Sequence, residues 1–95
     1  MAECHYRECD KPALEGGKYC ICHEPGEKDA AAFSATIGQQ MREGHYGFRG
    51  YVFPDEANFA GADFKGVADF RRARFEAGVD FTSAKFLDRV FFWET

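Results

Sequence analysis

The fold is decided by residues 57–92, ANFAGADFKGVADFRRARFEAGVDFTSAKFLDRVFF, in which phenylalanine recurs after alternating steps of five and six residues. The full period is therefore eleven residues, and it carries two series of phenylalanines. These series are Phe59, Phe70, Phe81 and Phe92, and Phe53, Phe64, Phe75 and Phe86. Self-similarity at a fixed period is the signature of stacked repeats, so the sequence predicts a solenoid.

Each repeat unit has the pattern of a short β-strand. A small residue and a phenylalanine stand two positions apart with a polar residue between them, as in Ala62-Asp63-Phe64. This alternation turns both apolar side chains to one face and the polar one to the other. The residues after phenylalanine favour turns: Gly61, Gly66, Gly78, Ser83 and Asp88. Strands this short gain stability by pairing with the equivalent residues of the next coil.

The units resemble the pentapeptide-repeat family, in which a small residue, Asn or Asp, Leu or Phe and two variable positions follow one another. The resemblance covers nine consecutive units, about half of the chain. It implies a mainly β fold, a short right-handed quadrilateral β-helix with four units per coil and Phe pointing inward. The extra residue in alternate units is similar to a Phe-rich variant of the family. An ordinary Phe-rich β-sandwich would not need this period.

Length and composition define the class of protein. Ninety-five residues, 45% of them hydrophobic, are enough for one compact domain or for a small module with a short solenoid. No apolar run approaches the ~20 residues of a membrane span, and the N-terminus lacks the pattern of a signal peptide. We therefore expect a soluble, cytoplasmic protein with no membrane association. Four cysteines in that reducing compartment indicate metal binding rather than disulfides.

The cysteines gather at the N-terminus with the spacing of a metal site. Cys4 and Cys9 form one pair, and Cys20 and His23 form a second pair ten residues further on. Two such pairs on turns are how a short chain surrounds a tetrahedral Zn²⁺ ion. We predict structural zinc on these four residues, although spacing alone does not exclude Cys22 or His5 as a ligand. Few aliphatic residues are available here to hold the segment together by burial.

Alternatives to a structural zinc site are weaker on chemical grounds. Four protein ligands leave no open position for water or substrate, which disfavours a catalytic metal. Reduced, metal-free cysteines and a redox pair formed by Cys20 and Cys22 are the other interpretations, and the redox pair lacks a thioredoxin-like context. The strings YCICH (19–23) and FRGYVFP (48–54) resemble a zinc-knuckle head that precedes some bacterial pentapeptide repeats. That resemblance implies a packing role for Cys22.

One helix is expected between the head and the repeats. From Lys28 to Gly44, apolar residues recur every four positions, at Phe33, Ile37 and Met41. Asp29 is suited to the N-terminal cap and Gly44 to the C-terminal cap. The expected role of this helix is to cover the N-terminal end of the solenoid. The predicted organisation is a zinc-binding head (1–27), a capping helix (28–45) and the repeats (46–95).

The C-terminal end of the repeats ends in an aromatic group. Phe91, Phe92 and Trp93 follow the last full unit, and too few residues remain for a second cap. An exposed aromatic group at an open β-end favours self-association. We expect either a homodimer through these three residues or a local folding-over of Trp93.

Charge guides the functional prediction. The formal net charge is −4, and zinc with three thiolates would add −1, which disfavours direct nucleic-acid binding. Members of the family that protect topoisomerases resemble DNA rods, and small acidic phage proteins such as anti-CRISPR inhibitors use similar electrostatics. The predicted contact residues for such a DNA mimic are Asp55, Glu56, Asp63, Asp69, Glu76, Asp80 and Asp88.

Two functional hypotheses result. The first is a non-enzymatic inhibitor or protector that occupies the DNA-binding surface of a DNA-handling complex, of phage or mobile-element origin. The second is a generic protein-interaction scaffold held together by zinc. From Phe48 onward the repeats carry eight acidic and seven basic residues, so most of the net negative charge lies in the head. An enzyme is a distant third interpretation, because no catalytic motif is visible.

Overall fold

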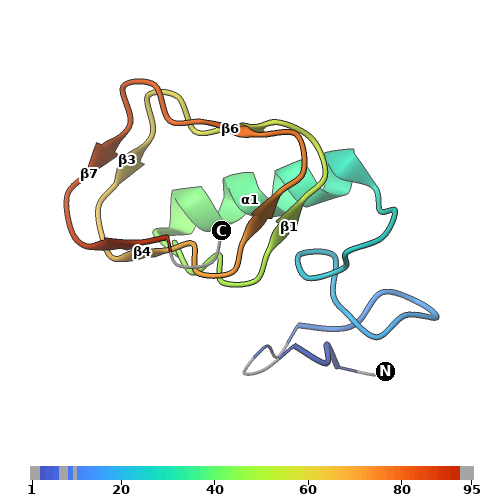
Figure 1. Ribbon diagram of the computed structural model, residues 1–95. Helices are drawn as coiled ribbons and strands as arrows, with labels where there is room; N and C mark the ends of the chain where they lie inside the picture. The colour runs from blue at the N-terminus through green and yellow to red at the C-terminus, as the bar shows by residue number, and fades with distance from the viewer. Residues whose placement is uncertain (1–2, 7–8, 10, 93–95) are drawn as a thin grey trace.

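The computed structural model describes residues 3–6, 9 and 11–92, and it places one helix before eight short strands (Figure 1). Helix α1 spans Ala30–Glu43. The strands are β1 (Val52–Phe53), β2 (Ala57–Asn58), β3 (Asp63–Phe64), β4 (Ala68–Asp69), β5 (Arg74–Phe75), β6 (Val79–Asp80), β7 (Lys85–Phe86) and β8 (Val90–Phe91). Among these residues, no helix is long and apolar enough to cross a membrane.

Each strand pairs in parallel with the strand four places later. The four sheets are β1–β5, β2–β6, β3–β7 and β4–β8, each of two strands. Their registers join residues 22 positions apart, for example Phe53 with Phe75 and Phe64 with Phe86. Four repeat units of alternating five and six residues have this length, so the eleven-residue period predicts the register. We call residues 52–73 the first coil and residues 74–92 the second coil.

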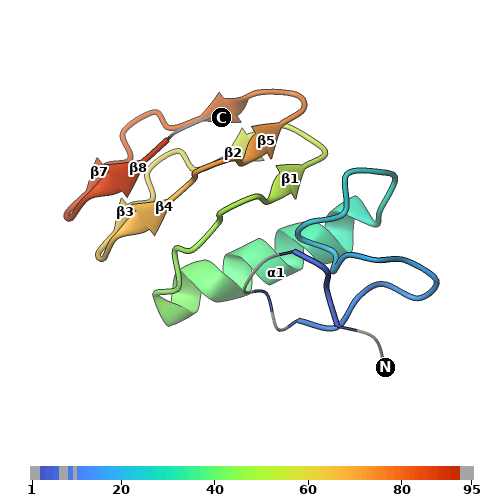
Figure 2. The same ribbon diagram turned by 60° about the horizontal axis from the view of Figure 1, so that its bottom comes forward.

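The core between the coils is built from stacked phenylalanine rings. Phe53 stacks on Phe75 with 4.8 Å between ring centroids, and Phe64 stacks on Phe86 at the same distance. Phe59 and Phe81, and Phe70 and Phe92, form the other two stacks. The rings of the first coil are buried, whereas Phe92 is 38% exposed. The core therefore lies toward the first coil. Helix α1 lies on the side of the first coil that faces away from the second coil (Figure 2).

Helix α1 has the predicted caps and covers the first coil. The Asp29 side chain accepts a hydrogen bond from the Ala32 N–H, and Gly44 closes the C-terminus in the left-handed conformation. The helix is three residues shorter than the expected 28–44 because Lys28 and both capping residues lie outside it. The Phe33 ring meets Phe53 edge-on at 5.1 Å, and the Tyr51 hydroxyl donates to Gln40 Oε1 over 2.9 Å.

Segments before the first coil extend two of its four ladders. On the β4 side, the Phe48 N–H donates to the Asp69 carbonyl and Gly47 forms a parallel bridge with Asp69. On the β1 side, the Val52 N–H donates to the Cys22 carbonyl over 2.8 Å. One coil later, the equivalent Arg74 N–H donates to the Tyr51 carbonyl. A preceding coil in the same 22-residue register would therefore offer Val52 the carbonyl of residue 29, but the Cys22 carbonyl takes that place. A residue of the head therefore supplies the backbone group that a preceding coil would have supplied.

We expect Phe64→Ala to destabilise the protein more than Phe86→Ala, although both remove one ring from the same stack. Phe64 is fully buried in the first coil, whereas Phe86 is only partly buried in the second. Truncation of a buried Phe costs about 3–5 kcal/mol, and a partly exposed one costs less. Denaturant unfolding of both variants measures the difference. Equal losses would contradict a core centred on the first coil.

Candidate metal centre

Four side chains of the head come together in one group: Cys4, Cys9, Cys20 and His23. Their ligand atoms all lie within 4.8 Å of one another. The His23 Nδ1 atom is 3.3 Å from Cys20 Sγ and 3.6 Å from Cys4 Sγ, and the Sγ atoms of Cys9 and Cys20 are 3.9 Å apart. A tetrahedral zinc ion with bonds of ~2.3 Å to sulfur and ~2.0 Å to nitrogen separates its ligands by about 3.5–3.8 Å. The residues therefore fit such an ion.

Short backbone turns bring the two halves of the group into place. The Cys4 N–H donates to the Lys11 carbonyl, and the Cys9 N–H donates to the Tyr6 carbonyl, which folds the first loop back on itself. The N–H of His23 donates to the Cys20 carbonyl over 3.2 Å. This last turn places two ligand side chains, three residues apart, on the same side of the chain.

The imidazole of His23 is oriented by the repeat region. Its Nε2 atom lies 2.9 Å from the Arg49 carbonyl, which can only accept a hydrogen bond. Nε2 therefore carries the proton, and Nδ1 turns a lone pair toward the thiols, as a metal ligand must. Tyr6 stacks on the ring at 4.0 Å, and Tyr51 meets it edge-on at 5.1 Å. The metal centre and the first repeat unit thus share one packed cluster.

The two residues that spacing left open lie outside the group. Cys22 is completely buried, its carbonyl accepts the Val52 N–H, and it is absent from the set of mutually close ligand atoms. His5 is exposed and faces the edge of Tyr19 at 6.5 Å. The structure therefore favours the predicted set of four, with Cys22 in a packing and ladder-forming position.

Two thiols of the group, those of Cys9 and Cys20, have raised pKa values. Burial raises the pKa of the Cys9 thiol to about 12, and the nearby Cys20 adds to this effect. The pKa of Cys20 is also raised, first by its hydrogen bond with Cys22 and then by burial. Because a metal ion binds thiolates, its arrival must displace these protons, which makes metal uptake dependent on pH.

Lys28 ties the metal-binding turn to α1. Its Nζ donates to the Ile21 carbonyl over 2.6 Å and lies 4.4 Å above the Phe33 ring. Burial lowers the pKa of this ammonium, while Cys22, Cys20 and the acids Glu24 and Glu76 act in the opposite direction. No sequence pattern marks Lys28, Tyr6 or Arg49, because their roles arise from contacts between distant segments.

The predicted acidic contact residues are spread around the repeats. Asp63, Asp69 and Asp80 lie on β3, β4 and β6, and the others, Asp55, Glu56, Glu76 and Asp88, lie in the connections between strands. Asp69 forms an ion pair with Arg71 at 2.7 Å, and the hydrogen bonds from Arg71 lower the Asp69 pKa. Glu76 pairs with Arg74 at 3.4 Å, and Asp63 is in register with Lys85. The three acids that lie on strands therefore belong to three different strand pairs.

The predicted self-association residues lie at the end of the second coil. Phe91 is in register with Asp69, as an outward position requires, and Arg71 lies 5.2 Å over its ring. Phe92 continues the inner stack on Phe70 with 5.2 Å between centroids. Trp93 is outside the described residues.

The arrangement defines a repeat protein with a Cys/His metal centre at its N-terminal end. A family model described as pentapeptide repeats, in nine copies, matches residues 48–95, which is half of the chain. The chain therefore belongs to the pentapeptide-repeat family. No curated protein and no solved structure matches it.

Cys20→Ser is expected to abolish stoichiometric metal binding and to unfold the head, because it removes one of four ligands. Cys22→Ala should retain the metal, since its side chain lies outside the group. Metal content by atomic emission, together with circular dichroism before and after chelation, distinguishes the two variants. Retention of metal and thermal stability by Cys20→Ser would refute the predicted ligand set.

Gly50→Ala is expected to weaken metal binding, whereas Gly61→Ala should not. Both glycines have φ of +71°, so both substitutions bring similar backbone strain, roughly 1 kcal/mol. A Cβ at Gly50 would overlap the Tyr6 ring, which stacks on His23, whereas nothing lies near a Cβ at Gly61.

Competition with a chromophoric zinc chelator measures the affinity of both glycine variants. Equal zinc affinities would show that the contact of Tyr6 with Gly50 does not position the His23 ring.

Proposed function

We propose that the protein is a non-enzymatic interaction module, built from a right-handed quadrilateral β-helix and stabilised by structural zinc. The observation that carries this proposal is the two-coil repeat itself. Its parallel ladders hold polar side chains such as Asn58, Asp63 and Lys85 at fixed positions on two of the four strand pairs. Such an array suits recognition of a partner protein, and membership of the pentapeptide-repeat family supports the same interpretation.

Zinc is the metal that best suits the donor set. Three thiols and one imidazole, with separations close to tetrahedral values, favour zinc over metals that prefer oxygen ligands. All four coordination positions would be filled by the protein, so the ion would act as a structural support. Since three thiolates outweigh the Zn²⁺ charge, the loaded protein would carry a net charge of about −5, given −4 from the sequence.

DNA mimicry is the second candidate, and one corner of the molecule favours it. The negative charges of Glu24 in the head and Glu76 in the second coil both act against the burial that lowers the Lys28 pKa. Asp55 and Glu56 are exposed in the connection between β1 and β2. An inhibitor or protector of a DNA-handling complex, of the anti-CRISPR or topoisomerase-protecting type, would use this corner without binding nucleic acid itself.

We further propose that the protein works in the reducing cytoplasm and pairs through its second coil. The four cysteines are free thiols, as metal binding in that compartment requires. The second coil ends the two-stranded ladders, and Phe92 is 38% exposed there. A second copy placed end to end would cover this surface and form a homodimer together with Phe91 and Trp93.

A pull-down from bacterial lysate tests the interaction module. Tagged, zinc-loaded protein should retain a defined partner, and Cys20→Ser should lose it if the head shapes the binding surface. The experiment is repeated with excess duplex DNA. Displacement of the partner by DNA would support mimicry, whereas a partner indifferent to DNA would leave the plain scaffold. Failure of the zinc-loaded protein to retain any partner would contradict the proposed function.

A further inference from the structure

The first coil has an edge that the head does not cover. The ladders at β1 and β4 are extended by Cys22 and by residues 46–48, as described above. Strand β2, in contrast, belongs to a two-stranded sheet in which β6 is its single neighbour. Within the described part of the chain, therefore, no strand pairs with the side of β2 that faces away from the second coil.

The backbone of Asn58 points toward this uncovered side. The N–H groups of Ala57 and Phe59 donate to the Gly78 and Asp80 carbonyls of the second coil, at 3.0 and 2.8 Å. Backbone groups alternate in direction along a strand, so those of the intervening Asn58 are directed to the opposite edge. An unpaired edge of this kind is a template for another extended chain.

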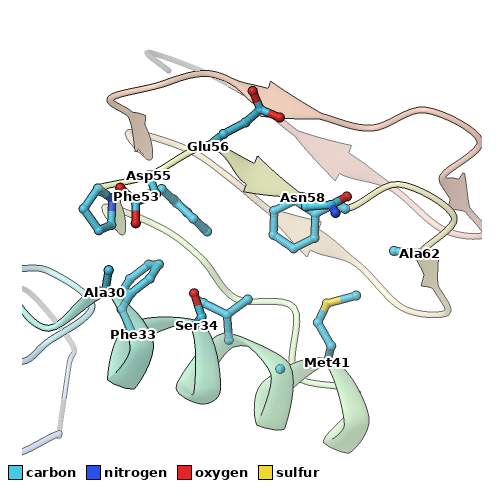
Figure 3. A pocket seen from close by; sticks show the side chains of 13 residues that line it. Ala30, Phe33, Ser34, Met41, Phe53, Asp55, Glu56, Asn58 and Ala62 are labelled. Atoms are coloured by element: carbon cyan, nitrogen blue, oxygen red, sulfur yellow. The ribbon is translucent and has the colours of Figure 1, made fainter.

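A groove of about 450 Å³ runs along this edge, between β2 and helix α1 (Figure 3). Phe33 and Phe53 lie at one end, and Met41 and Ala62 lie at the other. Along α1, the eleven residue steps from Ala30 to Met41 cover about 16 Å at ~1.5 Å per residue. An extended segment of about five residues has this length, at ~3.3 Å per residue.

The rim of the groove is acidic near one end. Asp55 and Glu56 line it, both are exposed, and neither makes an ion pair within the described part of the chain. The opposite rim contributes Ser34, and no basic side chain is among the described residues that line the groove. Its apolar floor and negative rim are therefore complementary to a segment with apolar and basic residues.

We propose that this groove binds an extended peptide segment of a partner protein as an added β-strand beside β2. The segment would place alternate apolar side chains against Phe33, Ile37 and Phe59, and a Lys or Arg beside Asp55 and Glu56. Its backbone would pair with Asn58, which supplies affinity independent of sequence, while the floor and rim supply specificity. This inference rests on the proposed function and specifies the chemistry of the partner.

The geometry disfavours a second copy of the chain as the occupant. Helix α1 faces β2 across the groove, so the space admits a single segment and not a whole two-coil end (Figure 3). The open end proposed for dimerisation lies on the second coil, beyond β6. The two surfaces are thus separate and are tested separately.

A random linear heptapeptide library displayed on phage is the probe. It is panned on the full zinc-loaded chain and counter-panned against Ser34→Trp, which fills the groove from an exposed helix position. Ala35→Trp is the matched control, because Ala35 is also exposed on α1 but does not line the groove. Selected peptides should carry apolar residues at alternating positions with a Lys or Arg, and should bind Ala35→Trp like the parent chain.

Two perturbations test the binding mode by fluorescence polarisation. The double substitution Asp55→Lys and Glu56→Lys should weaken peptide binding about tenfold. The control, Glu15→Lys with Asp88→Lys, makes the same change of charge away from the groove and should leave binding unchanged. N-methylation of successive peptide amides should weaken binding about tenfold at a single position, because only the amide that donates to the Asn58 carbonyl loses a hydrogen bond to β2.

The outcomes separate this inference from the proposed function. A library that yields no peptide would overturn the groove as a strand-binding site. Peptides that bind Ser34→Trp equally well, or N-methylation losses that are not confined to one amide, would overturn it as well. A partner from lysate that Ser34→Trp still retains would likewise reject the groove while leaving the interaction module intact.

Discussion

The Val52 N–H donates to the Cys22 carbonyl, and the His23 imidazole donates to the Arg49 carbonyl. Through these two hydrogen bonds the head closes one ladder of the first coil and the coil orients a metal ligand. Two coils are a short repeat array, and such arrays need a covered end because each coil buries its apolar face only against a neighbour. The cover over the first coil is therefore the constraint on which the fold and its core depend.

The metal centre explains how so small a head can provide that cover. Residues 3–27 supply few apolar side chains, so ligand bonds must replace a hydrophobic core. The ion would fix the turn that carries Cys20 and His23, and this turn presents the Cys22 carbonyl to β1. Lys28 then joins the same turn to α1, which lies against the first coil. With the ion bound, helix docking and the register of the repeats would form one cooperative unit with the metal centre.

The sequence predicted the repeat architecture well because its signal is local and periodic. The spacing of Phe53, Phe64, Phe75 and Phe86 specifies a register of two periods, and the structure has it. The grouping of Cys4, Cys9, Cys20 and His23 followed from spacing, whereas the exclusion of Cys22 depends on its side chain lying outside the set of mutually close ligand atoms. The contacts of Gly50 with Tyr6, and the groove beside β2, join segments far apart in sequence. No periodic pattern marks such contacts. The distribution of the acidic residues over different strands likewise depends on the coil geometry, which the spacing of single residues does not specify.

Amide hydrogen exchange at Val52, with and without a chelator, tests most directly whether the metal-supported head closes the first coil. We predict strong protection of the Val52 N–H in the zinc-loaded protein and loss of that protection when the metal is removed. Protection of the Arg74 N–H, which donates to Tyr51 in the same ladder, should fall with it. Unchanged exchange at both amides after complete metal removal would contradict the account, because the first coil would then be stable without the head.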